Sequence, residues 1–448
     1  MLASAGSARV DFDGEGDNDI LFGGSGNDTL RGGSGNDYLE GGAGADRIEA
    51  GADNDAIFGV INDLLGDSID AGAGTDKLEV KGTSRSDLLR FAGNGTTLEI
   101  YNIPTGPQSN MATASGLESL LIVPADGADT VLLEDSVRSA VGRFEVNLRE
   151  DSNKQLADTV NLIQSAFADR VDVNASVSLE PSTVRRLTDF PALASTNFVD
   201  TTSATWGLAN GPTTSLSISG QGSNDEFVVR GGDGNDVFNI NAININTRIE
   251  GQADADTFTV GSNASTTNSN GALTGIKANL AVDGGSQPVD LLTIDKSGDS
   301  TNNLGTIAST GSAAGLSGFG IAGGRQISFA ALGQVNLNLG SGADDLTIQG
   351  SHASVQQISI DGRAGADQFN VRAIAAAVTI QGGEGVDRFN VGSNATTSTN
   401  SGGTLNAIAA LLTLQGAAAQ ASATHCWWMK PEMPPLTAVR SAATASLD

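Results

Sequence analysis

The 448-residue sequence is short of cysteine, aromatic residues and basic residues. Its single Cys excludes an intrachain disulfide framework, and an aromatic content of 4% argues against one compact aromatic-rich core. Only 24 Lys and Arg stand against 52 Asp and Glu, a net charge of −28, so the chain is a poor partner for an anionic membrane and we expect no nucleic acid partner. No run of about 18 apolar residues occurs, and we expect no transmembrane segment.

Targeting signals are also missing from the start of the chain. Residues 1–10 lack the basic start and apolar stretch of a secretory signal peptide. Because the sequence opens almost directly into a repeat, we expect it to be part of a larger polypeptide.

Glycine is abundant, with 58 residues, and much of it lies in a nine-residue repeat. Residues 23–49 read GGSGNDTLR, GGSGNDYLE and GGAGADRIE, and looser copies occupy 14–22, 50–58, 62–70 and 71–79. Each unit has an acidic residue sixth and an apolar residue eighth, a spacing that a flexible linker would not keep. The acidic residues are Asp19, Asp28, Asp37, Asp46, Asp55, Asp67 and Asp76.

The residue types of the repeat predict a metal-binding turn followed by a short strand. Gly at the first, second and fourth positions permits positive φ and lets backbone carbonyls face a common centre. The Asp adds a carboxylate, and an all-oxygen ligand set suits Ca²⁺. One such strand buries almost nothing, so the units must stack, with two nonapeptides in each coil.

Carboxylates two nonapeptides apart then lie on the same edge of neighbouring coils and are expected to share a cation. The intact pairs are Asp19 with Asp37, Asp28 with Asp46, and Asp37 with Asp55. A short insertion precedes the unit at 62–70, and the pairs that span it are expected to fit less well. These are Asp46 with Asp67 and Asp55 with Asp76.

The units resemble the RTX, or haemolysin-type calcium-binding, nonapeptide, whose pattern is Gly-Gly-x-Gly-x-Asp-x-apolar-x. The resemblance covers about residues 13–80 and implies a parallel β-roll, Ca²⁺ in the turns, and export to the outside of a bacterium. It implies as ligands the seven Asp residues together with turn oxygens of Gly24, Gly26, Gly33, Gly35, Gly42 and Gly44. Asp17 and Asp53 replace the fourth-position Gly, which Asp tolerates because it adopts left-handed conformations.

Scattered copies of the repeat return later in the chain. Good nonapeptides occupy 231–239, 362–370 and 382–390, a looser one occupies 251–259, and two segments recur at a constant 131-residue offset. Alternating apolar and polar residues between them predict half-buried strands, with Asn side chains stacked in ladders. Two equally spaced pairs either share a cation or form metal-free polar turns: Asp236 with Asp256, and Asp367 with Asp387.

We therefore predict an all-β fold, a parallel β-roll continuing into an elongated, irregular parallel β-solenoid. The predicted regions are the roll at 11–80, a diverged solenoid region at 81–220, a solenoid with the 131-residue repeat at 221–424, and an aberrant tail at 425–448. Asp295 and Asp299, in the segment TIDKSGDS, are expected in a solvated turn.

The tail contains the only Cys and no Gly. Shifting the reading frame of its HCWWMKPEM segment by two bases restores a sequence close to residues 292–299. We therefore hypothesise a frameshift at His425 and expect a disordered tail that exposes Trp427 and Trp428.

The sequence carries no catalytic signature. HExxH, a Cys/His zinc spacing and G-x-S-x-G are all missing, so we predict that the chain is not an enzyme. The leading hypothesis is an extracellular structural or adhesive protein that folds on binding Ca²⁺ and contacts cell-surface polysaccharide or other surface proteins. One alternative is a calcium-dependent secretion or carrier module of a larger toxin or hydrolase. A β-helix enzyme acting on polysaccharide is a third, less favoured because basic residues are sparse.

Overall fold

The structure is a computed structural model. It describes residues 8–64, 66–102, 112–125, 128–134, 136–137, 140–148, 159–163, 169–179, 198–208, 213–220, 226–232, 234–264, 269–286, 289–396, 403–416 and 425–427. Two compact units are present, and each is treated by itself. Unit 1 comprises Met1–Ser165 and Ala175–Arg230, and unit 2 comprises Ala166–Asn174 and Gly231–Asp448.

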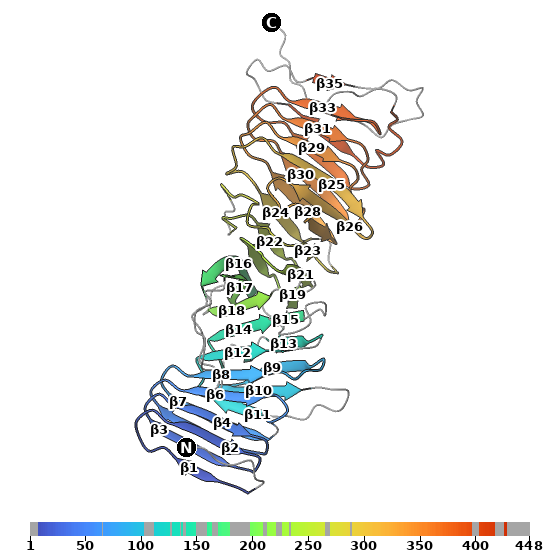
Figure 1. The fold of residues 1–448 in the computed structure, drawn as a ribbon. Coiled ribbons are helices and arrows are strands. Elements are labelled where there is room, and N and C mark those ends of the chain that lie inside the picture. Colours follow the sequence, from blue (N-terminus) through green and yellow to red (C-terminus); the bar gives the residue numbers. More distant parts are fainter. Residues whose placement is uncertain are drawn as a thin grey trace. The chain divides into compact units, whose positions relative to one another are not determined.

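The N-terminal nonapeptides of unit 1 and the residues just before them form eight short strands that alternate between two parallel sheets (Figure 1). They are β1 (Asp11–Asp13), β2 (Ile20–Gly24), β3 (Thr29–Ser34), β4 (Tyr38–Gly42), β5 (Arg47–Ala52), β6 (Ala56–Val60), β7 (Asp67–Ala73) and β8 (Lys77–Lys81). Thr29 lies opposite Arg47 and Tyr38 opposite Ala56, so one coil spans two nonapeptides, as predicted. The prediction of a parallel β-roll is confirmed.

The core of this roll consists mainly of one Leu or Ile from each of β2–β8, and Ala50, Ala71 and Val80 are buried as well. Each eighth-position residue is 0–2% exposed, and these residues are Leu21, Leu30, Leu39, Ile48, Ile57, Ile69 and Leu78. A single Leu or Ile per strand makes a narrow core, which exists only because successive coils place these side chains on one another.

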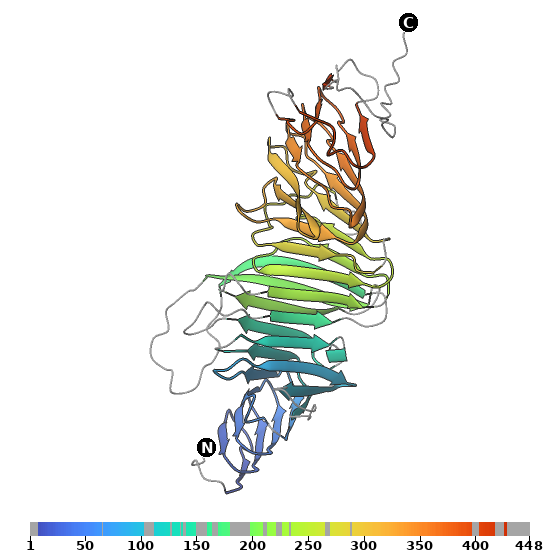
Figure 2. The ribbon, with the colours of Figure 1, turned by 90° about the vertical axis from the view of Figure 1, so that its right-hand side faces the viewer.

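Parallel coils continue through the rest of unit 1, as expected, but antiparallel hairpins interrupt them. The strands are β9 (Leu88–Asn94), β10 (Thr97–Asn102), β11 (Ala112–Ser115), β12 (Ser119–Val123), β13 (Thr130–Glu134), β14 (Arg143–Leu148), β15 (Thr159–Ile163), β17 (Phe198–Leu208), β18 (Thr213–Gly220) and β19 (Glu226–Gly232). One parallel ladder runs β8–β12–β14–β18 and another β9–β13–β15–β19. β9–β10–β11 and β17–β18 pair antiparallel, which the sequence pattern did not predict (Figure 2).

Unit 2 is also built from parallel coils. Its strands are β20 (Val237–Ile240), β21 (Asn246–Gln252), β22 (Thr257–Val260), β23 (Leu280–Asp283), β24 (Leu291–Asp295), β25 (Leu304–Thr310), β26 (Ala313–Gly318), β27 (Ile327–Ala330), β28 (Leu332–Asn338), β29 (Asp345–Ile348), β30 (Val355–Asp361), β31 (Gln368–Val371), β32 (Ala377–Gln381), β33 (Arg388–Val391), β34 (Leu412–Gln415) and β35 (His425–Trp427). A further strand, β16 (Asp169–Leu179), pairs with β20 through Arg170–Val173. Only β25–β26–β27 pair antiparallel among the pairings described within this unit.

The 131-residue sequence repeat is also a structural repeat. Phe238 stacks on Phe258 with ring centroids 4.9 Å apart, and Phe369 stacks on Phe389 at 5.3 Å. The predicted amide ladder is present in the second copy, where Asn390 Nδ2 donates to Asn370 Oδ1 at 2.8 Å.

In the C-terminal segment, residues 425–427 form β35, which pairs in parallel with β33. Residues 428–448, including Trp428, lie outside the described part, as does the Trp427 side chain. The frameshift remains a hypothesis.

Candidate metal-binding turns

The sixth-position aspartates of the roll form two hydrogen-bonded ladders, one for each edge. From Asp37 onward, the Oδ1 atom of each accepts the backbone N–H of the aspartate one coil earlier, and Asp28 Oδ1 accepts that of Val10. The bonds are Asp19 to Asp37 at 2.8 Å, Asp28 to Asp46 at 2.7 Å, Asp37 to Asp55 at 2.8 Å, Asp46 to Asp67 at 2.7 Å and Asp55 to Asp76 at 2.8 Å. All predicted pairs are therefore neighbours, and the two pairs that span the insertion are bonded in the same way as the others.

The second carboxylate oxygen is the unusual atom of these turns. Oδ2 is buried and accepts no hydrogen bond from any residue that the structure describes in Asp19, Asp28, Asp37, Asp46, Asp55 and Asp76. Apart from Asp19, these residues are 0–3% exposed. A buried charged oxygen without a partner costs free energy, so its repetition in successive turns points to an ion as the missing partner.

The first glycine of each unit makes space beside this oxygen. A Cβ on Gly23 would lie 2.7 Å from Asp28 Oδ2 and would overlap the carbonyl oxygen of Gly41 in the next coil. A Cβ on Gly14 would likewise lie 2.6 Å from Asp19 Oδ2. Each turn thus has a recess bordered by a carboxylate oxygen and a carbonyl oxygen, both hard donors of the type that Ca²⁺ prefers.

The other predicted turn glycines adopt the left-handed conformation, with one exception. Gly24, Gly33, Gly35, Gly42 and Gly44 have φ of 116°, 110°, 117°, 92° and 141°. Gly26 is not among the positive-φ residues, but a Cβ there would lie 2.7 Å from the carbonyl oxygen of Ala8. Asp17 and Asp53 have φ of 70° and 78°, as their replacement of the fourth-position Gly predicted.

Burial disfavours the charged form of these carboxylates. Together with a smaller contribution from neighbouring aspartates, it raises the pKa of Asp46 and Asp55 to about 6 and that of Asp67 to about 7. The pKa values of Asp37 and Asp76 are raised as well, again chiefly by burial. Without an added positive charge the turns therefore favour a proton, and a bound cation would reverse that preference.

Unit 2 repeats the same bond with longer coils. The bonds run from the backbone N–H of Asp236 to Asp256 at 2.9 Å, Asp256 to Asp290 at 2.8 Å, Asp344 to Asp367 at 2.7 Å and Asp367 to Asp387 at 3.1 Å. The predicted pairs Asp236–Asp256 and Asp367–Asp387 are thus brought together.

The second oxygens in unit 2 also match those of the roll. Oδ2 of Asp256, Asp290, Asp367 and Asp387 is buried and lacks a hydrogen bond within the described residues. Burial raises the pKa of Asp256 and Asp367 to about 7 and also raises those of Asp290 and Asp387.

Sequence reasoning missed two members of these ladders. Asp290 lies 34 residues after Asp256 and Asp344 lies 23 before Asp367, so neither fits the spacing of the predicted pairs. The signal for Asp290 was the pair Gly284–Gly285 ahead of it, since a Cβ on Gly284 would lie 2.5 Å from Asp290 Oδ2. In unit 1 the ladder also extends beyond the nonapeptides, where Glu118 accepts from Asp76 and Asp129 accepts from Asp87, both at 2.7 Å.

The prediction of a solvated turn at Asp295 was wrong. Asp295 is completely buried, and its Oδ2 accepts the N–H of Gly271 at 2.7 Å. Asp299 is also mostly covered, with 15% of its side chain exposed.

Side chains alone do not complete a metal site in the part of the chain that the structure describes. No group of three or more His, Cys, Asp and Glu side chains is placed to hold an ion. Each turn offers carboxylates from neighbouring coils, so backbone carbonyls must supply the other ligands, as the glycine-rich sequence predicted.

Comparison with known proteins identifies the repeat. The family model described as the RTX calcium-binding nonapeptide repeat, in four copies, matches residues 13–48 and 31–60. No curated protein matched the chain. Within the described residues, no helix is long and apolar enough to cross a membrane.

Proposed function

From the premise that residues 13–60 are RTX calcium-binding nonapeptide repeats, we propose that the chain is an extracellular structural or adhesive protein whose folding depends on Ca²⁺. The proposed ligands are the ladder aspartates of the roll and of unit 2, with carbonyl oxygens of the turns between them. The observation that carries the proposal is the buried Oδ2 atom without a hydrogen bond, which recurs beside a glycine in turn after turn.

Calcium would act by stabilising contacts between coils. Each proposed ion lies against a carboxylate whose other oxygen is already bonded to the preceding coil, so binding reinforces the stacking on which the narrow core depends. The unfolded chain has no preformed turn, and binding free energy therefore becomes folding free energy. Extracellular calcium modules need dissociation constants of only about 10⁻⁴ to 10⁻³ M.

Such weak sites suit secretion. A chain whose roll remains unfolded at low calcium inside the cell passes through a secretion channel more easily than one with a folded roll, and the roll folds where calcium is plentiful. RTX repeats are typical of secreted bacterial proteins, which supports this assignment.

A non-catalytic role agrees with the side chains around the recesses and cavities. The ladder carboxylates are already engaged by the backbone. A cavity of about 230 Å³ in unit 1 is lined by residues that include Arg47, Glu49, Asp70 and Thr113, without His or Cys. Arg47 and Glu49 form an ion pair with each other there.

Circular dichroism of the full chain tests calcium-dependent folding. The chain is prepared in chelator at pH 7.5 and titrated with Ca²⁺, with Mg²⁺ as the control ion. Because the roll is the part expected to depend most on calcium, we expect the β-signal to rise with Ca²⁺ at submillimolar to millimolar concentration and not with Mg²⁺, which dehydrates reluctantly and demands octahedral geometry. A β-signal that is complete in chelator and unchanged by Ca²⁺ would contradict the proposal.

The extracellular assignment has its own test. Antibody against unit 2 should label intact cells of the producing bacterium, and protease added outside the cells should remove the label. Labelling that requires permeabilised cells would refute the assignment without affecting the calcium sites.

A further inference from the structure

Asp344 differs from the other ladder aspartates of unit 2 because both of its carboxylate oxygens have partners. Lys296 Nζ donates to Asp344 Oδ2 at 3.1 Å and to Oδ1 at 3.2 Å. The side chains of both residues are 0% exposed. In Asp256, Asp290, Asp367 and Asp387 the corresponding Oδ2 has no hydrogen-bond partner among the described residues.

The ammonium group lies where the recess lies in the other turns. A Cβ on Gly340, four residues before Asp344, would be 3.2 Å from Lys296 Nζ. In the neighbouring coils the glycine five residues before the aspartate, Gly362 or Gly382, approaches its Oδ2 directly. The positive charge of Lys296 therefore stands between a ladder carboxylate and a turn glycine.

The surroundings of Lys296 are arranged for a positive charge. Asp299 Oδ2 lies 3.6 Å from Nζ, and the ring centroid of Phe319 lies 5.5 Å from it. Burial acts to raise the pKa of Asp299, but hydrogen bonds from Thr301 and the charge of Lys296 outweigh it, and the net shift is downward.

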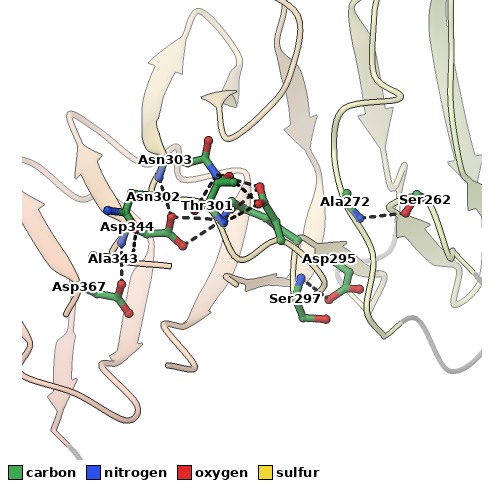
Figure 3. Close-up of polar contacts among 12 residues, drawn as sticks. Ser262, Ala272, Asp295, Ser297, Thr301, Asn302, Asn303, Ala343, Asp344 and Asp367 are labelled. Carbon is green, nitrogen blue, oxygen red and sulfur yellow. Dashed lines mark hydrogen bonds and ion pairs between the residues drawn. The ribbon is translucent and has the colours of Figure 1, made fainter. Parts of the chain in front are cut away.

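The segment that carries Asp299 is itself bonded to the ladder. Asn303 donates its backbone N–H to Asp344 Oδ1 at 3.0 Å and its side chain to Asp299 Oδ2 at 2.8 Å. Figure 3 shows Asp344 between this segment and Asp367, the next aspartate of the ladder. Asp299 and Asp344 thus place carboxylate oxygens beside a single ammonium group, and Asn303 links the two carboxylates.

We propose that Lys296 is a built-in substitute for a bound cation at the Asp344 turn, which it holds together without calcium. Replacing it with a neutral residue would convert this turn into one that requires a divalent ion. The inference rests on the proposed function only in its comparison with the neighbouring turns, since the Lys296–Asp344 pair stands without them.

An ordinary buried ion pair is the simpler interpretation, and it makes a different prediction. Removing one member of such a pair destabilises a protein because the other charge is left buried. A merely structural pair has no reason to be replaced by Ca²⁺. A substitute for a cation does, because the carboxylate and carbonyl oxygens that remain are ligands suited to the metal.

The experiment is hydrogen exchange of the full chain in chelator and in millimolar Ca²⁺, read on peptides covering 296–303 and 340–350. The variants are Lys296→Met, Asp344→Asn and the double variant, with Lys277→Met as the control at an exposed lysine of the same unit. We expect wild type and Lys277→Met to be equally protected at this turn in both buffers. Lys296→Met should exchange about tenfold faster or more in chelator, and Ca²⁺ should restore its protection.

The double variant separates charge from packing. Since it leaves no buried charge unpaired, it should exchange more slowly in chelator than Lys296→Met alone. If Lys296→Met does not fold in chelator, recovery by Ca²⁺ and by Asp344→Asn supports the proposal. Unchanged exchange in Lys296→Met, or a loss of protection that Ca²⁺ does not reverse, overturns it.

Peptides from residues 28–50 in the same wild-type samples test the proposed function separately. If they do not respond to Ca²⁺, the calcium sites of the roll fail. The exchange rates of the single and double variants in chelator then still decide whether the Lys296–Asp344 pair holds the turn together.

Discussion

The roll at the start of unit 1 and the coils of unit 2 use the same aspartate ladder but support it differently. Coils of the roll span two nonapeptides and bury one Leu or Ile per strand. Successive bonded aspartates of unit 2 lie 20 to 34 residues apart, and its coils add stacked Phe rings, an Asn ladder and Lys296. An aromatic side chain buries about 150–250 Å². Under the proposed function, a coil this narrow would depend on cations, whereas the larger coils have additional contacts.

The largest expected difference between the two regions follows removal of calcium. Hydrogen exchange of the full chain in chelator should accelerate in residues 20–60 much more than in residues 355–391. One site held at about 100 times its dissociation constant contributes about 2.7 kcal/mol, or roughly a hundredfold in the open population, and the roll has several such sites. Equal acceleration in both regions would show that the Phe and Asn contacts of unit 2 do not replace calcium.

The second-largest expected effect is the pH dependence of the stability of the metal-free roll, because several carboxyl groups contribute to it. The pKa values of Asp46 and Asp55 are raised to about 6 and that of Asp67 to about 7, above the ordinary 3.8. The folded state therefore binds protons more tightly than the unfolded state. The resulting stabilisation is complete below about pH 3.8 and is lost as pH rises through 6 to 7.

In chelator we accordingly expect more β-structure by circular dichroism at pH 5 than at pH 7.5. Calcium affinity should instead be higher at pH 7.5 than at pH 5, since a carboxyl ligand must release its proton to bind the ion. A metal-free roll that is less folded at pH 5 would contradict the burial of these carboxylates.

The close approach of neighbouring coils at the second glycine of a unit can be tested with two substitutions at positive φ. A Cβ on Gly42 (φ 92°) would overlap the carbonyl oxygen of Gly24, whereas a Cβ on Gly95 (φ 65°) would meet nothing within 4 Å. Gly95→Ala should cost about 1 kcal/mol from backbone strain alone, and Gly42→Ala about 2 kcal/mol more from the clash. Thermal unfolding in calcium measures both, and equal losses would mean that the coils separate easily at this turn.

The smallest effect distinguishes the two roles of a ladder aspartate. Asp46→Asn keeps an oxygen for the N–H of Asp28 but removes the charge. In chelator the variant should be more stable than wild type by about 1 kcal/mol, because a buried charge is relieved. In calcium it should be less stable, because a ligand charge is lost. The exposed Asp70→Asn serves as the control and should change neither value. Destabilisation of Asp46→Asn in both buffers would mean that Asp46 acts only through its hydrogen bond with the backbone and not as a calcium ligand.

The roll was predictable from sequence because its spacing is local and regular. Nine-residue periodicity placed Asp28 and Asp46 on one edge and gave the coil length before any coordinates. It did not reveal that Oδ1 is already bonded to the backbone, which leaves only Oδ2 for a cation.

Contacts between distant residues could not be predicted in the same way. Asp290 was missed because the coil before it is enlarged to 34 residues. The hairpin β9–β10–β11 was missed because alternating apolar residues do not specify the direction of the partner strand. The buried Lys296 depends on Asp344, 48 residues away, and an isolated lysine in a Ser-Gly-Asp segment is ordinarily a surface residue.

The most direct test of the central claim is anomalous diffraction from crystals of the full chain grown in millimolar Ca²⁺. We predict peaks about 2.3–2.6 Å from Oδ2 of Asp28, Asp37 and Asp46, and none beside Lys296. Peaks missing from the roll, with these oxygens bonded to water instead, would contradict the account.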